Sequence, residues 1–508
     1  KLSAAFQPAQ EYFSESKNIL PGDSWEKNYH LTFDIFKCLS ENSYICGNFD
    51  EAEFSVKLLL NKAQTSLDKA EIYHIQAVQY TTMQKLKEAI EVAKKGLEIL
   101  GVTLEKNYQE NQVLEQAMLV NKNLGNRKIS DLINEPEIIN PEKRLTIKLL
   151  QDIFLPSYSL GLKNNLAFCI MKAVNFCLEN GKVSEMPYIL NVYAFLLGHV
   201  FGDLKTAYEF GKVAQKLNEH FNDPKNKTVN LFTNITFVQY WNQSAKICVE
   251  NYKKVIETGL ENGDLIYMSY ACANILQWDT GINLITAIDE GEKYLKIVKS
   301  FKFQDSIDVT NIFHHLRLNF AGKTNDQFSL SSEVFDESEM LSRLEKTQNY
   351  LVLAVYFIYK LQPFYHYENY QDALIYINEA EKYAAALAGQ AHIVDFTLFS
   401  FLTHTALYHN MTKEEKQQID LRLEKDTNLL KLWSENMPDN FEHLLYLMQA
   451  EMARIKNNIL KADELYRKSI LLADKNSFIH HQALANELAG KLWLNNNRDF
   501  AGLYFKKA

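Results

Sequence analysis

The chain has 508 residues, of which 47% are hydrophobic and 23% charged, and its formal net charge is −9 at pH 7. A nucleic-acid-binding protein is expected to show a basic patch, so this acidic balance argues against a nucleic-acid partner. Glycine and proline, the two residues that interrupt helices, number only 18 and 9. This composition favours long helices over strands and predicts an all-α protein.

The first helices are expected over residues 1–20, 25–45 and 51–62, with turns near 21–24 and 47–50. The helix in 1–20 is interpreted as the second member of a pair whose first member is missing. Its predicted buried face consists of Phe6, Ala9, Tyr12 and Phe13. The sequence starts with Lys1 rather than Met and stops within a helix, so we expect a piece of a longer protein.

Residues 68–101 contain the clearest pair of helices. The first should bury Ala77 between Tyr73 and Tyr80, which share one helical face. The second presents an apolar face at helical spacing, and Gly101 is placed to end it. This face consists of Leu86, Ala89, Ile90, Ala93, Gly96 and Leu97. Because such a pair cannot bury both of its faces alone, it needs neighbours of the same kind.

A polar turn followed by an alanine recurs along the chain. Ala52 precedes Ala89 by 37 positions, and Ala462 precedes Ala501 by 39. Further copies surround Ala207 and Ala373. A unit of this length predicts roughly 12 helix pairs stacked into a superhelical α-solenoid. Ala89, Ala207, Ala373 and Ala462 should be almost fully buried, each where the two helices of its pair meet.

Three parts of one continuous array are expected: N-terminal repeats over 1–128, middle repeats over 129–320 and C-terminal repeats over 321–508. Residues 102–145 are less regular and are interpreted as a joint between sub-arrays. A helix is expected near 111–123, followed by a polar loop at 129–131. Residues 321–338 form the one long polar loop, and Asp336 can cap the helix that follows.

No catalytic, cofactor or metal site is predicted. The six cysteines form no CxxC pair and are interpreted as small buried residues of a reduced, cytoplasmic protein. The pairs His314–His315 and His480–His481 lack zinc-site spacing, and adjacent helical positions should point in two directions. The acids at 336–339 are interpreted as charges that complement the helix dipole. No apolar run reaches the length of a membrane span.

The stretch 356–370 is unusually aromatic and contains Pro363, which should kink or end its helix. One interpretation is a bulky core between repeats. The other is an aromatic surface for a peptide on the inner face of the array. The candidate partner-binding residues are Tyr356, Tyr359, Phe364 and Tyr367.

The helix pairs with their G-[DN]-[FYL]-x-x-A turns resemble tetratricopeptide repeats. Several segments more specifically resemble the helical region of large bacterial signalling proteins, which also carry a serine/threonine kinase-like domain, a STAND/AAA ATPase, a GAF domain and a sensor histidine kinase. These segments are 20–25, 89–101, 335–341, 380–389, 433–441 and 483–489. The motifs of those catalytic domains are absent from this sequence, so the resemblance implies architecture and context rather than an active site.

The expected function is therefore a non-catalytic protein-interaction and regulatory region of a larger bacterial signal-transduction ATPase or kinase. Its partner would be a protein or peptide, including a flanking ATPase or kinase domain of the same protein. One alternative is a free-standing repeat adaptor or secreted effector. Another is an α/α-toroid enzyme, which should close into a ring and gather acids or metal ligands at the helix ends on one face.

Overall fold

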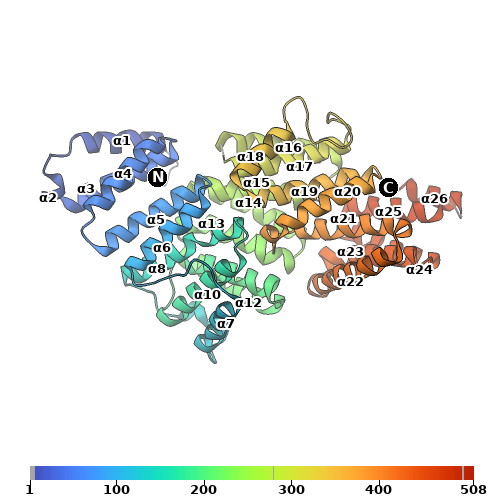
Figure 1. The fold of residues 1–508 in the computed structure, drawn as a ribbon, viewed down its shortest axis with the longest axis horizontal. Coiled ribbons are helices and arrows are strands. Elements are labelled where there is room, and N and C mark those ends of the chain that lie inside the picture. The colour runs from blue at the N-terminus through green and yellow to red at the C-terminus, as the bar shows by residue number, and fades with distance from the viewer. Residues whose placement is uncertain (1–5, 279, 302, 495–496) are drawn as a thin grey trace. The chain divides into compact units, whose positions relative to one another are not determined.

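A computed structural model describes residues 6–278, 280–301, 303–494 and 497–508 (Figure 1). These residues form 26 α-helices with short 3₁₀ and π segments, and they contain two isolated β-bridges but no strand. The prediction of an all-α protein built from packed helix pairs is confirmed. No helix among the described residues is both long enough and apolar enough to cross a membrane.

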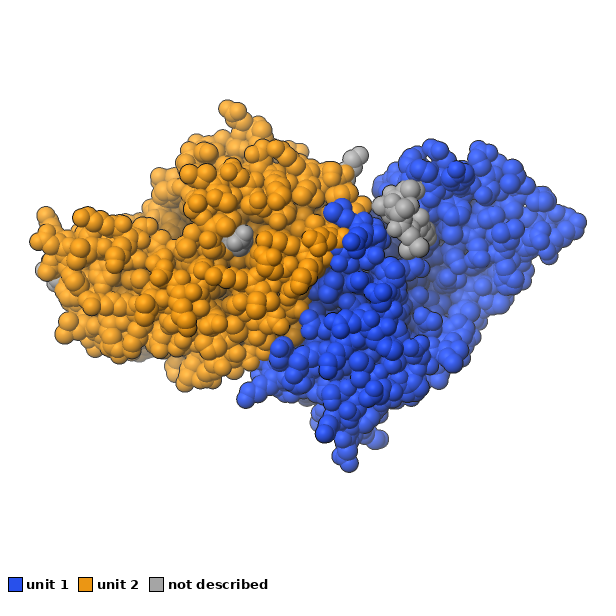
Figure 2. Space-filling model, turned by 180° about the vertical axis from the view of Figure 1, so that it is seen from behind, with its two compact units in different colours: residues 1–234, 258–264 blue, residues 235–257, 265–508 orange. Residues whose placement is uncertain are grey.

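The chain divides into two compact units, which Figure 2 colours separately. Unit 1 comprises the described residues of 1–234 together with 258–264, and unit 2 comprises the described residues of 235–257 and 265–508. Helices α13 (Pro224–Phe237) and α14 (Ala245–Asn262) each contribute to both units. The division into three parts at 128 and 320 remains a prediction.

Unit 1 holds α1 (Phe6–Asn18), α2 (Ser24–Lys27), α3 (Tyr29–Ile45), α4 (Phe49–Lys62), α5 (Ser66–Thr82), α6 (Leu86–Ile99), α7 (Glu110–Leu124), α8 (Pro141–Asp152), α9 (Phe154–Ser159), α10 (Lys163–Asn180), α11 (Met186–Phe195) and α12 (Leu204–Phe221). Helices α3 and α4, α5 and α6, and α11 and α12 form closely packed pairs, whereas α7 packs against α10. Residues 129–134, expected as a loop, form a 3₁₀ turn.

Two details of the N-terminal region differ from the predictions. The helix expected over 25–45 is interrupted at Asn28, which separates α2 from α3. Helix α1 packs against α3, but Tyr12 is 75% exposed. Gln10 is buried instead, and its amide donates a hydrogen bond to Ser43 Oγ at 2.7 Å. An amide with a buried partner therefore lies where an apolar stripe was expected.

The recurring turn has one backbone conformation. Gly47, Gln84, Gly202, Glu368 and Asn457 all have positive φ, between 58° and 83°. This left-handed residue reverses the chain at low cost when it is glycine or asparagine. The residue after it precedes the second helix, and in three copies its side chain accepts a hydrogen bond from the backbone three residues on. The turn signature thus encodes both chain reversal and a helix cap.

The alanine that follows each turn is buried, as predicted. The exposed fraction is 0% for Ala89, Ala373 and Ala462 and 3% for Ala207. Ala52 and Ala501 are also buried. A methyl group at this position lets the second helix approach the first closely, and larger side chains fill the space on either side.

We expect Ala373→Leu to lower the free energy of unfolding by about 1–3 kcal/mol, because three extra carbons must enter the tightly packed contact between α19 (Tyr350–His366) and α20 (Tyr370–Tyr383). Urea denaturation would measure this loss. Gln371→Leu, on the exposed face of the same helix, is the matched control and should change stability by less than about 0.5 kcal/mol. Equal stability of the wild type and Ala373→Leu would show that the alanine is not a packing constraint.

Unit 2 holds α15 (Leu265–Trp278), α16 (Leu284–Phe301), α17 (Gln304–Phe320), α18 (Glu337–Thr347), α19 (Tyr350–His366), α20 (Tyr370–Tyr383), α21 (His392–Leu407), α22 (Lys413–Asn436), α23 (Pro438–Ile455), α24 (Ile459–Lys475), α25 (Ile479–Trp493) and α26 (Arg498–Phe505). The first helices of successive pairs contact one another in order, namely α15, α17, α19, α21, α23 and α25. Among the described residues, the second helices make no contact of comparable extent with each other. The first helices therefore line the inner, shorter side of this stack.

The stack in unit 2 curls back on its own beginning. The amide nitrogen of Asn440, in α23, donates hydrogen bonds to the carbonyls of Tyr240 and Gln243 at 2.8 Å. The backbone nitrogen of Ile479 donates to the carbonyl of Thr280 at 3.3 Å. These contacts join segments about 200 residues apart. As a consequence, α25 faces α17 and α19 across an inner space. Such closure is one of the two features that the toroid alternative requires.

Helix α19 continues through Pro363 to His366, so the proline does not end it. The backbone nitrogen of Tyr367 still donates to the carbonyl of Pro363 at 2.9 Å, which shows regular helical bonding beyond the proline. The side chains from Leu361 to Tyr365 are all buried. Packing on every side therefore holds the last turn in place although the ring removes one backbone donor.

Residues 321–336 form the predicted loop, and Asp336 caps α18 by accepting a hydrogen bond from Ser338 N. Glu337 lies in the first turn of α18, where its charge was expected to complement the helix dipole, and it is also enclosed, with only 9% of its surface exposed. Its carboxylate accepts hydrogen bonds from Ser329 Oγ at 2.9 Å and from Leu330 N at 3.2 Å. This carboxylate therefore fixes the end of the loop to the helices.

Candidate functional site

The structure places Tyr356 and Tyr359 in the interior of unit 2, each 3% exposed. The hydroxyl of Tyr356 donates to Glu337 Oε2 at 2.9 Å, and that of Tyr359 donates to Asp395 Oδ2 at 2.5 Å. Tyr356 binds the buried carboxylate of Glu337 and Tyr359 the half-buried one of Asp395, so these tyrosines are core residues with satisfied polar ends.

Phe364 is also buried, with its ring 4.7 Å from that of Phe328 and 4.6 Å from that of Tyr376. Tyr367 differs from the other three because 37% of it is exposed. Buried rings that already have partners are not available to a peptide. Of the four candidate partner-binding residues, only Tyr367 is therefore accessible to a peptide. A partner contact at Tyr367 remains a prediction.

Tyr367 lies at a cavity of about 400 Å³ on the inner side of unit 2. First helices α17, α19, α21 and α25 supply most of its walls. The lining residues are Phe320, Gln362, His366, Tyr367, Phe399, His480, His481, Ala483, Leu484, Glu487 and Ala508. We take this cavity as the candidate functional site because it combines an inner surface with several polar groups.

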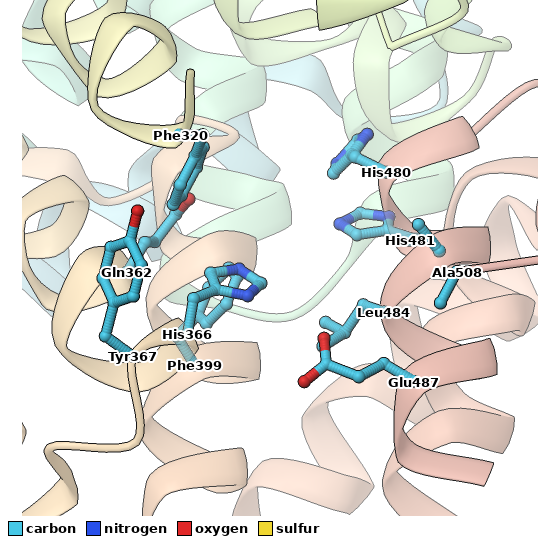
Figure 3. Close-up of a pocket in the computed structure, with 11 residues that line it drawn as sticks. Phe320, Gln362, His366, Tyr367, Phe399, His480, His481, Leu484, Glu487 and Ala508 are labelled. Atoms are coloured by element: carbon cyan, nitrogen blue, oxygen red, sulfur yellow. The ribbon is translucent and has the colours of Figure 1, made fainter. Parts of the chain in front are cut away.

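Figure 3 shows two facing walls. One wall is built from Phe320, His366 and Phe399, whose rings meet edge to face at centroid distances of 5.1 and 5.5 Å. The opposite wall comes from α25, where His480, Leu484 and Glu487 follow the i, i+4, i+7 spacing of one helical face. Three different repeats therefore supply the aromatic wall, and a single helix supplies the polar one.

The side chains of His480 and His481, in α25, were predicted to point in two directions, but they lie together. Their ring centroids are 3.8 Å apart, and both rings line the cavity. His480 is exposed within it, whereas His481 is 6% exposed. His481 Nδ1 lies 2.9 Å from His443 Nε2, on α23. His481 Nε2 and His443 Nδ1 have no hydrogen-bond partner among the described residues.

The imidazoles around the cavity are neutral at pH 7. Burial lowers the pKa of His366 to about 4 and the pKa of His443 to about 3, and it holds the pKa of His481 well below its usual value. Glu487 pairs with Lys491 at 2.6 Å, and Lys491 also pairs with Glu368 at 2.7 Å. This three-residue cluster has a net charge of −1, so the charge at this side of the cavity is negative.

The histidine pair at 314–315 serves the fold. Both side chains are buried, and His315 bonds to Asn311 O and Ser332 Oγ, which ties α17 to the long loop. Within the described parts of the chain, no group of three or more His, Cys, Asp or Glu side chains has the arrangement of a metal site. Four of the six cysteines are buried, in line with their interpretation as core residues.

His366, His481 and Glu487 were not predicted from the sequence as lining residues of one site. The spacing of His480, Leu484 and Glu487 on a predicted helix shows that they share a face. No local pattern shows that this face meets His366, more than 100 positions earlier, because that contact depends on how the stack curls.

No family model matches the chain. The chain is 21% identical over 351 residues, or 63% of its length, to the hybrid signal transduction histidine kinase G of Dictyostelium discoideum, and it spans only 10% of that protein. Among solved structures, the crystal structure of yeast Tom70 is 13% identical. The comparison covers 98% of this chain and 95% of the Tom70 chain, with a TM-score of 0.31.

Proposed function

We propose that this chain is a non-catalytic protein-interaction and regulatory region of a larger signal-transduction protein. The observation that carries the proposal is the continuous row of first helices in unit 2, which presents a partly exposed, aromatic and polar inner surface. Stacked repeats use such surfaces to bind proteins and peptides. The partner binds across α17, α19, α21 and α25, with Tyr367 and His480 as accessible contacts.

The similarity to a hybrid signal transduction histidine kinase supports the signalling setting, since the matched stretch is a small fraction of a much longer protein. In this proposal the partner is a flanking ATPase or kinase domain of the same protein. A bacterial origin, which the resemblance stated above implies, and a cytoplasmic location, inferred from the cysteines, belong to the proposal. Among the described lining residues Glu487 is the only one with a side-chain carboxylate, so the cavity lacks the gathered acids that the toroid-enzyme alternative requires.

The purified chain is expected to show neither ATP hydrolysis nor phosphotransfer. It should bind the flanking ATPase or kinase domain of its parent protein, with affinity measured by titration calorimetry. Tyr367→Ala combined with His480→Ala should weaken this binding about tenfold, since two accessible contacts are removed from the centre of the surface. Both residues are exposed, so the double variant should retain the wild-type melting temperature.

Tyr383→Ala is the matched control, because Tyr383 is a half-buried tyrosine at the end of the second helix α20. It should bind like the wild type. Nucleotide turnover by the isolated chain would contradict the non-catalytic assignment. Equal binding by the double variant and the wild type would show that the partner uses another surface.

A further inference from the structure

One short segment holds distant parts of unit 2 together. Residues 239–245 connect α13 to the first turn of α14 and include a 3₁₀ turn, and we call them the clasp. In a linear array of repeats, each repeat contacts only its neighbours. The clasp instead makes hydrogen bonds to residues that follow it by 148 to 200 positions, in the turn before α21 and on helices α22 and α23. The beginning of unit 2 is therefore joined directly to its second half.

Asn440, in α23, binds the backbone of the clasp with its whole side-chain amide. Its Nδ2 donates to the carbonyls of Tyr240 and Gln243, both at 2.8 Å, and its Oδ1 accepts from the backbone nitrogen of Ala245 at 3.0 Å. An asparagine amide offers two N–H hydrogens and one acceptor oxygen, and all of them are used here. Because Asn440 is only 1% exposed, water cannot take over these bonds, and their loss would leave buried backbone groups unpaired.

Trp241 fixes the clasp in the core of unit 2. It is 1% exposed, and its ring centroid lies 5.2 Å from that of Trp433 and 5.5 Å from that of Phe441. The indole Nε1 donates a hydrogen bond to the carbonyl of Gly389 at 3.0 Å. The backbone carbonyl of Trp241 accepts a hydrogen bond from Asn436 Nδ2, at the end of α22. One residue of the clasp thus contacts three separate segments of the second half of the unit.

A second contact joins the first repeat of unit 2 to the last one. The backbone nitrogen of Ile479 donates to the carbonyl of Thr280 at 3.3 Å, and Thr280 Oγ1 donates to the carbonyl of Ser477 at 3.2 Å. A Cβ atom placed on Gly281 would lie 3.4 Å from the Cβ of Ser477. The two Cβ atoms of a disulfide are generally about 3.5–4.5 Å apart. Cysteines at positions 281 and 477 can therefore hold this contact covalently.

We propose that the clasp closes unit 2 into a single cooperative body, in which the first and last repeats open together rather than one by one. In an open array the terminal repeats open most easily, because each has only one neighbour. In unit 2 the first and last repeats also contact each other, so α16 and α25 should be protected from hydrogen exchange as well as α19, in the middle of the row. The closure holds α25 opposite α19, so the inner cavity keeps its shape without a bound partner. This inference does not depend on the proposed function.

Asn440→Asp releases the clasp with little change in side-chain volume, because an ionised carboxylate donates no hydrogen bond and would face the carbonyls of Tyr240 and Gln243. Hydrogen exchange of the full chain, followed by mass spectrometry of its peptides, should become roughly tenfold faster in α16 and α25 than in the wild type. Helix α16 is the decisive readout. Its extensive contacts among the described residues are with α15 and α17, so damage confined to the surroundings of residue 440 would not reach it. Asn428→Asp, at an exposed position of α22, is the matched control and should exchange like the wild type.

A disulfide should reverse the effect. Gly281→Cys and Ser477→Cys are added to Asn440→Asp, and the same protein is measured oxidised and reduced. The oxidised form should return the exchange of α16 and α25 to within about threefold of the wild type, because the bond replaces the lost closure, whereas the reduced form should remain fast. If Asn440→Asp prevents unit 2 from folding, the oxidised form should still fold. Asn436→Ala, which removes only the bond to the Trp241 carbonyl and a bond to Asn242, should then give a smaller acceleration in the same helices.

Three results would overturn the inference. The first is a wild-type chain in which α16 and α25 exchange much faster than α19, since its ends would then open independently. The second is an Asn440→Asp variant in which only α23 and its direct neighbours exchange faster, while α16 stays slow. The third is equal exchange of α16 and α25 in the oxidised and reduced forms of the cysteine variant.

Discussion

Lowering the pH from 6.5 to 4.5 is expected to reduce the free energy of unfolding of unit 2 by an amount on the order of 5 kcal/mol. Burial lowers the pKa values of His392 and His443 to about 3 and those of His314 and His404 to about 4. All four are less than 9% exposed. The unfolded chain takes up protons at these histidines below pH 6.5, whereas the folded chain does not.

The sign follows from which state binds more protons. When the pKa of a histidine is lower in the folded state than in the unfolded state, the free energy of unfolding decreases as the pH falls from about 6.5 toward the folded-state pKa. Burial raises the pKa values of Asp395 and Asp426 to about 6, and these two groups act in the opposite direction because the folded state takes up their protons first. Four deeply buried histidines outweigh two aspartates, so acidification destabilises the unit.

Urea denaturation at several pH values, followed by tryptophan fluorescence, measures this effect. Four of the five tryptophans, Trp241, Trp278, Trp433 and Trp493, belong to unit 2. His392→Gln retains a partner for the Tyr359 hydroxyl, which is 3.1 Å from His392 Nδ1, but does not titrate. It should lose about 2–3 kcal/mol less than the wild type over this range. His220→Gln, at an exposed position of unit 1, is the control and should leave the pH dependence unchanged. A wild-type free energy of unfolding that does not change between pH 6.5 and 4.5 would refute the prediction.

Lys360→Met is expected to lower the free energy of unfolding by about 3–5 kcal/mol, because it leaves the Glu337 carboxylate buried without its cation. Lys360 is 4% exposed, and its Nζ lies 2.7 and 2.8 Å from the two carboxylate oxygens. Burial lowers the pKa of Lys360, although the nearby Glu337 opposes this shift. The same carboxylate accepts hydrogen bonds from Tyr356 and from the long loop. In the Lys360→Met variant, the backbone amides of this loop should therefore exchange their hydrogens faster than in the wild type.

The exposed pair of Lys296 and Glu292 is the matched control. Its atoms are 3.0 Å apart, but its side chains are 75% and 60% exposed. Lys296→Met should change stability by less than about 1 kcal/mol, since water screens the pair. Replacing both buried partners, by Lys360→Met with Glu337→Gln, should recover part of the loss because no unpaired charge remains. A loss from Lys360→Met no greater than that from Lys296→Met would show that the buried charge finds another partner.

The sequence by itself determined the helix pairs of this protein. Helical periodicity placed the apolar face of α6, and the polar turns before Ala89 and Ala373 marked the chain reversals. Before Ala373 the turn also supplies a helix cap, through Asn369. These signals are local: each depends on residues within about four positions of one another. The alanines were predictable for the same reason, since a small residue at a fixed distance after a turn marks a close helix contact.

Tertiary structure alone decided which helical faces meet and which charges are buried. Glu337 and Asp336 are adjacent acids in the sequence, yet only Glu337 is enclosed, because Lys360 and Tyr356 lie over it. The cavity depends on contacts such as that of Asn440 with Tyr240, which join segments 200 residues apart and bring His481 opposite His366. The direction in which a stack curls is the sum of small rotations between repeats. No local pattern encodes that sum, so the cavity becomes visible only when all of the pairs are packed.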